Sequence, residues 1–262
     1  MKILKLGQML GGSNAPSGGY ENLYSLDFDG TNDYVDFGDS DAFSINESGA
    51  NRGFSVSCWV KTTGTSDTII SKSLSGSTNN EYQLEVGRDG KVTFWVYGGG
   101  SGFIYQYLRV DTPIVGDGNW HHVVGTFDLA DATTSILVYI DGVLYNAASA
   151  DTSYGATGIW AAATNTTAAL EMGRRGNGTN YFGGNIDEVS IFDTKLAGMD
   201  VLAMYNSGTP TDLSGETYLL GYWRNGDTEG TSVYPEIEDY STKNNPGTMT
   251  NMASGDIVTV VP

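Results

Sequence analysis

The stretch Asn119-Trp120-His121-His122-Val123-Val124-Gly125-Thr126-Phe127-Asp128 decides the fold class of this chain. In a β-strand the side chains repeat with a period of two, so neighbouring residues of this stretch are expected on opposite faces of a strand. After a polar turn, Ile136-Leu137-Val138-Tyr139-Ile140 returns as the second arm of a hairpin. Asp141-Gly142 then leads into Val143-Leu144-Tyr145, and an Asp-Gly pair between two such runs is a strong hairpin signal. Antiparallel β-structure is therefore predicted here.

The same period recurs along most of the chain, in short runs separated by Gly, Asn and Asp. Two apolar stripes that flank the turn at 87–90 are Tyr82/Leu84/Val86 and Val92/Phe94/Val96. One short helix is expected over 199–205, where Asn206-Ser207-Gly208 ends it. Many short strands with turn residues between them predict an all-β fold, a sandwich or a barrel.

Composition excludes several classes of partner. The 262 residues include 31 Asp or Glu and 13 Lys or Arg, which gives a formal net charge of −18. Nucleic acids and anionic membrane surfaces bind clustered Lys and Arg, so neither is an expected partner. Membrane insertion is not expected, because no run approaches the about 18 apolar residues that a spanning helix needs. The single cysteine, Cys58, excludes an intrachain disulfide framework.

Four segments together resemble the laminin-G-like, concanavalin A-like lectin/glucanase superfamily, in its bacterial and phage branch. They are residues 26–35 (LDFDGTNDYV), 54–60 (FSVSCWV), 119–128 (NWHHVVGTFD) and 184–192 (GNIDEVSIF). The resemblance covers about 170 residues and includes the short helix after the last segment. It implies an all-β, two-sheet antiparallel jelly-roll sandwich with one short helix, and a role in glycan or protein binding.

Three parts of the chain are expected. Residues 1–19 are interpreted as an N-terminal docking arm, residues 20–205 as the sandwich, and residues 206–262 as a C-terminal extension. The extension looks like the segment that usually opens such a module, so it packs either on its own sandwich or on a neighbouring subunit. Modules with this closing segment resemble stand-alone structural or adhesion proteins of marine tailed phages.

Catalysis is not expected, although the superfamily contains glycoside hydrolases. Those enzymes carry two glutamates and an aspartate alternating on one strand, and the chain has no Glu-x-Asp-x-x-Glu or Glu-x-Asp-x-Glu run. The nearest carboxylate cluster, Glu236-Ile237-Glu238-Asp239, lies in a Pro-containing loop. No Gly-x-Ser-x-Gly elbow is present either.

Alternation also predicts which aromatic side chains face away from the core and could stack on sugar rings. If Cys58, Phe94 and Val138 face inward, their strand neighbours face outward. The predicted ligand-binding residues are Trp59, Trp95, Tyr97, Tyr139, Tyr105 and Arg174. Two alternatives stay open: the aromatic rings could be covered by loops, by the tail or by another subunit, and Arg174 with Arg175 could simply neutralise carboxylates.

Carboxylates around one turn offer a candidate cation site. Calcium takes six to eight oxygen ligands, and the resemblance implies that Asp187 lies near the N-terminal strand. The predicted metal residues are Asp29, Asp33 and Asp187, with structural Ca²⁺ as the ion; the alternative is that they are turn-forming side chains. His121 and His122 point to opposite faces and cannot ligate one metal, and His121 is expected to face the core.

The sequence thus favours a non-enzymatic surface module, a virion-associated structural or adhesion protein that binds glycans or a host surface. The alternative is a purely structural capsid or tail decoration subunit without a ligand, and a glycoside hydrolase ranks last. The virion surface is the expected location, with an extracellular or cell-surface location as the alternative. Residues 1–19 would contact other virion or surface proteins, and homo-oligomer formation stays open.

The calcium hypothesis has a direct test. Removing a structural Ca²⁺ by chelation is expected to lower the melting temperature, because an ion bound only by the folded state stabilises it. A melting curve that is unchanged by EDTA and by added Ca²⁺ would contradict the site.

Overall fold

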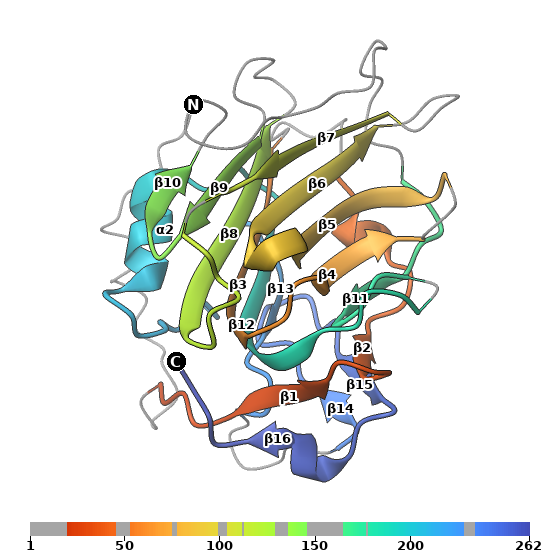
Figure 1. The fold of residues 1–262 in the computed structure, drawn as a ribbon, viewed down its shortest axis with the longest axis vertical. Helices are drawn as coiled ribbons and strands as arrows, with labels where there is room; N and C mark the ends of the chain where they lie inside the picture. Colours follow the sequence, from red (N-terminus) through yellow and green to blue (C-terminus); the bar gives the residue numbers. More distant parts are fainter. Residues whose placement is uncertain are drawn as a thin grey trace.

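The structure is a computed structural model that describes residues 20–45, 53–74, 78–98, 104–111, 113–128, 136–145, 165–176, 178–227 and 234–262. Two eight-stranded, antiparallel sheets face each other, as predicted. The described residues include one α-helix, the short α2 (Gly198–Tyr205), which Figure 1 shows at the side of the sandwich. Among the described residues, no helix is both long and apolar enough to span a bilayer. The proposed arm, residues 1–19, lies outside the described residues.

The first sheet, called sheet A, has the strand order β10-β9-β8-β3-β12-β1-β16, and β13 also pairs with β12. Its strands are β1 (Ser25–Asp29), β3 (Gly53–Thr62), β8 (Trp120–Asp128), β9 (Ile136–Ile140), β10 (Val143–Tyr145), β12 (Gly183–Phe192), β13 (Leu219–Trp223) and β16 (Ile257–Val258). The predicted hairpins over 121–145 are therefore present as β8-β9-β10.

The second sheet, called sheet B, has the strand order β14-β15-β2-β11-β4-β5-β6-β7. Its strands are β2 (Tyr34–Asp36), β4 (Asp67–Ser73), β5 (Asn80–Val86), β6 (Val92–Gly98), β7 (Ile104–Arg109), β11 (Leu170–Met172), β14 (Glu236–Ile237) and β15 (Gly247–Thr250). Short 3₁₀ turns cover Asp41–Phe43, Arg88–Gly90 and Ser254–Asp256.

The opening stretch explains how closely the sheets approach. Gly125 lies on β8, and a Cβ atom built there would lie 2.6 Å from the ring of Phe94 on β6 of the other sheet. No real side chain tolerates that distance, so the glycine lets the Phe94 ring rest on the β8 backbone. Val123 and Phe127 flank this contact and are fully or almost fully buried in the same core. The prediction that Val123 and Phe127 face the core is confirmed.

The C-terminal residues complete both sheets of their own chain. β13 pairs with β12 and β16 with β1 in sheet A, while β15 pairs with β2 in sheet B. Figure 1 shows the first strands (red) and the last strands (blue) side by side at the lower end of the sandwich. A segment that ends the sequence therefore supplies strands beside those that begin it.

A second apolar cluster covers the outer face of sheet A. Helix α2 starts with the Ala197 N–H donated to the Asp200 carboxylate at 3.0 Å, and it buries Val201 and Met204 against the sheet. Tyr139 and Tyr222 belong to this cluster. Sheet A is thus buried on both faces over this region, which an alternation rule for a half-exposed sheet does not anticipate.

Beside this cluster, buried charges tie the chain's first described residues to its tail. Glu188 has a φ of 49° at a bulge of β12, and it accepts a hydrogen bond from the Tyr222 hydroxyl. Arg224 lies 3.6 Å from Glu188 and donates to Asp227 at 3.1 Å. Asp227 in turn accepts the backbone N–H groups of Leu23 and Tyr24, each at 2.8 Å. This polar cluster fastens residues 20–24.

Two groups beside one small cavity give stability opposite dependences on pH. Burial raises the pKa of Glu188 to about 7, so its contribution to stability is lost as pH rises from about 4.5 to 7. Burial lowers the pKa of His122 to about 4, so its contribution grows as pH rises from about 4 to 6.5. Both residues line the cavity with Ser57 and Trp59. The two effects oppose each other in the unmodified protein.

Glu188→Gln is therefore expected to change the pH profile. The melting temperature of the variant minus that of the unmodified protein should rise by several degrees between pH 5 and pH 8. One pKa unit is about 1.4 kcal/mol, and each kcal/mol shifts melting by about 2–4 °C at this chain size. Glu238→Gln, at an exposed position, is the matched control. A difference that stays constant with pH would refute this account of the polar cluster.

Candidate ligand-binding site

A pocket of about 350 Å³ opens on the outer face of sheet B, the face turned away from sheet A. β5, β6 and β7 supply most of its lining residues, and Arg175 and Asn180 complete the lining. Its lining residues are Asn80, Gln83, Glu85, Trp95, Tyr97, Tyr105, Arg175 and Asn180. The volume falls in the range of about 300–1,000 Å³ that is typical of small-ligand sites.

Strand register brings the aromatic side chains together. Trp95 on β6 pairs with Tyr107 on β7, and Tyr97 pairs with Tyr105, so that the four side chains share one face. The Trp95 ring centroid lies 4.3 Å from that of Tyr107 and 5.4 Å from that of Tyr105. Trp95 and Tyr97 are nearly parallel, with an interplanar angle of 14°. We call these four rings the aromatic surface.

The floor of the pocket holds one carboxylate with both oxygens occupied. Glu85 accepts a hydrogen bond from Trp95 Nε1 at 2.8 Å and another from Gln83 Nε2. Burial raises the pKa of Glu85, and these two donors act in the opposite direction. The Trp95 ring is therefore held in place at its polar edge, which leaves its faces for contacts with other rings.

Arg175 and Gln83 each carry a buried polar atom that has no hydrogen-bond partner within the described part of the chain. Arg175 Nη2 donates to the Tyr97 hydroxyl at 3.4 Å, but its Nε is buried and unpartnered. Gln83 Oε1 is likewise buried and unpartnered, on a residue that is 1 % exposed. Because buried polar atoms normally find partners, both atoms mark this pocket as a place where further polar contacts would be favourable.

The structure brings three predicted ligand residues, Trp95, Tyr97 and Tyr105, into this pocket. It places two others elsewhere. Trp59 and Tyr139 do face away from the central core, but they are 3 % and 4 % exposed. Trp59 stacks on Tyr205 of α2, with ring centroids 5.8 Å apart. Neither ring has a face open to a sugar, because the second cluster covers the outer face of sheet A. Trp59 and Tyr139 are therefore packing residues and not the ligand-binding residues that the sequence predicted.

The prediction that Arg174 binds the ligand is also corrected. Its guanidinium donates to both oxygens of Glu171, at 3.1 and 2.5 Å, and lies 3.3 Å above the ring of Tyr34. The pocket instead receives the neighbouring Arg175. Arg174 therefore neutralises a carboxylate, which was the alternative interpretation of this pair.

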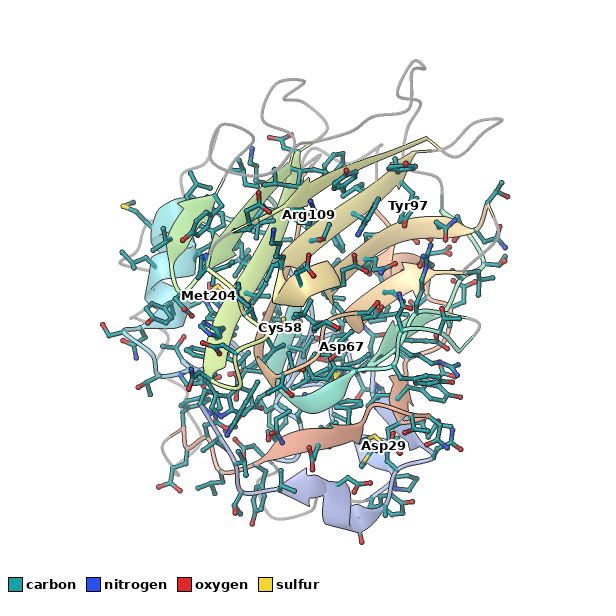
Figure 2. All side chains as sticks on the ribbon, in the orientation of Figure 1. Asp29, Cys58, Asp67, Tyr97, Arg109 and Met204 are labelled. Carbon is teal, nitrogen blue, oxygen red and sulfur yellow. The ribbon has the colours of Figure 1, made fainter. Side chains whose placement is uncertain are left out.

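The three predicted metal residues do not form one group. Asp29 accepts the N–H groups of Thr31 and Asn32 within its own turn, while Asp33 accepts the N–H of Asp29. Asp187 is fully buried beside Glu188, in the polar cluster described above. Among the described residues, no three acidic, His or Cys side chains come together as a metal site would require. Figure 2 shows Asp29 at the lower end of the sandwich and Tyr97 near its upper end.

The expectation that His121 faces the core is wrong. Its Nδ1 lies 2.7 Å from Asp141 and its Nε2 3.2 Å from Asp117, near the end of β8. The hydrogen bond with Asp141 raises the pKa of His121. His122 is the buried histidine; its Nε2 lies 2.8 Å from the Ser57 hydroxyl, and its ring centroid lies 5.1 Å from that of Trp59. The apolar residues that bury it come from α2 and the tail.

Sequence reasoning missed Gln83, Glu85 and Arg175 as site residues. A signal for the first two was available, because they alternate with the buried stripe Tyr82/Leu84/Val86 and must therefore face outward. No comparable signal separates Arg175 from Arg174. The path of the chain through Gly176 and the β-bridges around it decides which guanidinium enters the pocket.

The comparisons with known proteins can now be set beside this geometry. The family model Laminin_G_3, described as Concanavalin A-like lectin/glucanases superfamily, matches residues 29–201. The chain belongs to this superfamily. The aromatic surface lies within the matched residues, whereas the tail strands β13–β16 lie outside them. No curated protein matches the sequence.

Solved structures share the fold at low identity. A Bacteroides ovatus protein, named for a proposed carbohydrate-binding role, has 15% identity and a TM-score of 0.60; the match covers 93% of this chain and 62% of that one. This chain thus spans less than two thirds of that relative. A heptameric pentraxin from Limulus polyphemus has 14% identity and a TM-score of 0.48, over 72% of this chain and 84% of that one. Mouse laminin α1 domains LG4-5 have 16% identity and a TM-score of 0.41, over 71% and 46%.

Proposed function

We propose that the protein is a non-enzymatic glycan-binding module and that the aromatic surface is its binding site. The observation that carries this proposal is one open pocket lined by three rings of the aromatic surface, Trp95, Tyr97 and Tyr105, together with Arg175, whose buried Nε has no partner among the described residues. Sugar rings present apolar C–H faces between hydroxyl groups, so they suit a site with aromatic faces and polar edges. Membership of a lectin and glucanase superfamily supports it, as does the name of the Bacteroides relative.

The chemistry of the pocket favours binding over hydrolysis. Glycoside hydrolysis ordinarily uses two carboxyl groups on either side of the scissile bond, about 5 to 9.5 Å apart. Of the residues that line the pocket, Glu85 alone is a carboxylate, and Trp95 and Gln83 already occupy its oxygens. A second carboxylate in position for acid–base work is not among them. We therefore assign the pocket to recognition.

Trp95→Ala is expected to weaken glycan binding at least about tenfold, which corresponds to about 1.4 kcal/mol of lost contact. A glycan array followed by calorimetry on the strongest hits would measure this. The matched control is Tyr234→Ala, which removes a 42 % exposed aromatic ring near β14, at the opposite end of sheet B. An array without hits, or hits that survive Trp95→Ala in a folded variant, would contradict the proposal. Measurable hydrolysis of a bound glycan would contradict the non-enzymatic assignment.

We further propose that this module acts on the surface of a virion, with residues 1–19 as its attachment to the assembly. The support is the resemblance of the sequence to phage modules and the outward-facing pocket. Calcium stays part of this proposal only as a stabilising ion near Asp29 and Asp33. A decoration subunit without a ligand is the alternative, and it would keep the same attachment.

Deletion of residues 1–19 is expected to abolish incorporation into the particle and to leave the melting temperature within about 2 °C of the full chain. Co-sedimentation with assembled particles would measure the first and calorimetry the second. Normal incorporation of the shortened chain would refute the role of the arm.

A further inference from the structure

We propose that the pocket selects glycans that carry a carboxylate, such as uronic or sialic acid residues, and that the Arg175 guanidinium binds this group. This inference rests on the proposed glycan-binding function and names the chemical class of its ligand. The neighbouring Arg174 offers an internal comparison for the argument, since the two side chains share a sequence context but not a set of contacts.

Arg175 is a cation without a carboxylate partner in the described part of the chain. Its hydrogen bond goes to the neutral Tyr97 hydroxyl at 3.4 Å, which is close to the limit for such a bond. Arg174 pairs with Glu171, Arg224 with Asp227 and Lys72 with Asp39. Although the chain carries 18 excess negative charges, the Arg175 guanidinium makes no ion pair with any of the residues that the structure describes.

Glu85, the carboxylate in the same pocket, does not act as the ion-pair partner of Arg175. Glu85 accepts hydrogen bonds from Trp95 and Gln83, and it is not ion-paired with Arg175. The attraction between the two charges therefore acts only over a longer distance, as a small effect of Arg175 on the pKa of Glu85. The guanidinium keeps donor capacity that this neighbour does not satisfy.

Guanidinium geometry specifies the partner. Its planar array of N–H donors matches a carboxylate with two parallel hydrogen bonds, and such charge-assisted pairs are roughly twice as strong as neutral ones. With a carboxylate on Arg175, the attached sugar ring would lie over Trp95 and Tyr105, which line the same pocket.

The net negative charge of the chain is compatible with binding of an anionic ligand at Arg175. At physiological ionic strength the screening length is about 8 Å, so a bound anion responds mainly to charges in its immediate surroundings. Elsewhere on this acidic surface an anionic glycan meets repulsion. A single unpaired cation among aromatic rings therefore defines where such a ligand can bind.

The test uses the full chain on an array of uronic-acid and sialylated glycans, each printed beside its carboxyl-reduced form. We expect at least about tenfold stronger binding to the acids. Arg175→Gln should lower this binding to the level of the reduced forms, and Arg175→Lys should restore part of it. Lys243→Gln, which removes an exposed positive charge, is the charge-matched control. A thermal melt of each variant confirms folding, and the uronic and sialic arms separate the two sources of the carboxylate.

The outcomes separate this inference from the function on which it rests. If Trp95→Ala abolishes binding but carboxyl reduction and Arg175→Gln leave it unchanged, the module binds neutral glycans and the carboxylate inference is wrong. If neither acidic nor reduced glycans bind in a Trp95-dependent way, the proposed function fails as well. Equal losses in Arg175→Gln and Lys243→Gln would reveal a general charge effect and would also overturn the role of Arg175.

Discussion

The backbone ladder of strand β12 is the interaction on which the rest of the sandwich depends. One edge of β12 pairs with β3 from Gly184 to Phe192, and the other edge pairs first with β1 and then with β13. The first strand of the chain and a strand of the tail therefore lie end to end along a single partner. A bulge at Glu188 marks the change, and the register with β3 shifts at the same place.

This arrangement explains why buried charges lie at the join. The bulge turns Glu188 toward Tyr222 and Arg224 of the tail, and Asp227 holds the backbone of residues 23 and 24. Buried carboxylates are costly unless hydrogen bonds and a counter-charge surround them, and here one guanidinium serves two of them. In return, these contacts hold residues 23 and 24 against the tail in one specific arrangement.

The two sheets use their outer faces differently, and this difference separates packing from recognition. α2 and the tail cover the outer face of sheet A, so Trp59 and Tyr139 are buried although they point away from the core. On sheet B the same alternation places Trp95 and Tyr97 around an open pocket. In both sheets these aromatic side chains point away from the core. Whether a ligand can reach them depends on which segment packs over the outer face of the sheet.

Much of the fold could be predicted from local pattern. The hairpins over 81–97 and 121–145 follow from side chains with a period of two, and their turns follow from Gly and Asp. Trp95, Tyr97 and Tyr105 could be placed on one face in the same way. The positions of Arg174, Arg175 and Asp187 could not, because a loop and a bulge interrupt the alternation there.

The sequence by itself determined the all-β class, the strand directions of the hairpins and the alternation of side chains along the regular strands, since these depend on neighbours within a few positions. Only the tertiary structure decided that the tail pairs with β12 and β2, that one aromatic face is covered and that Arg175 rather than Arg174 reaches the pocket. These outcomes depend on contacts between separate segments, some of them far apart in the sequence, such as β15 and β2. The free energy of that packing is not encoded in any local period.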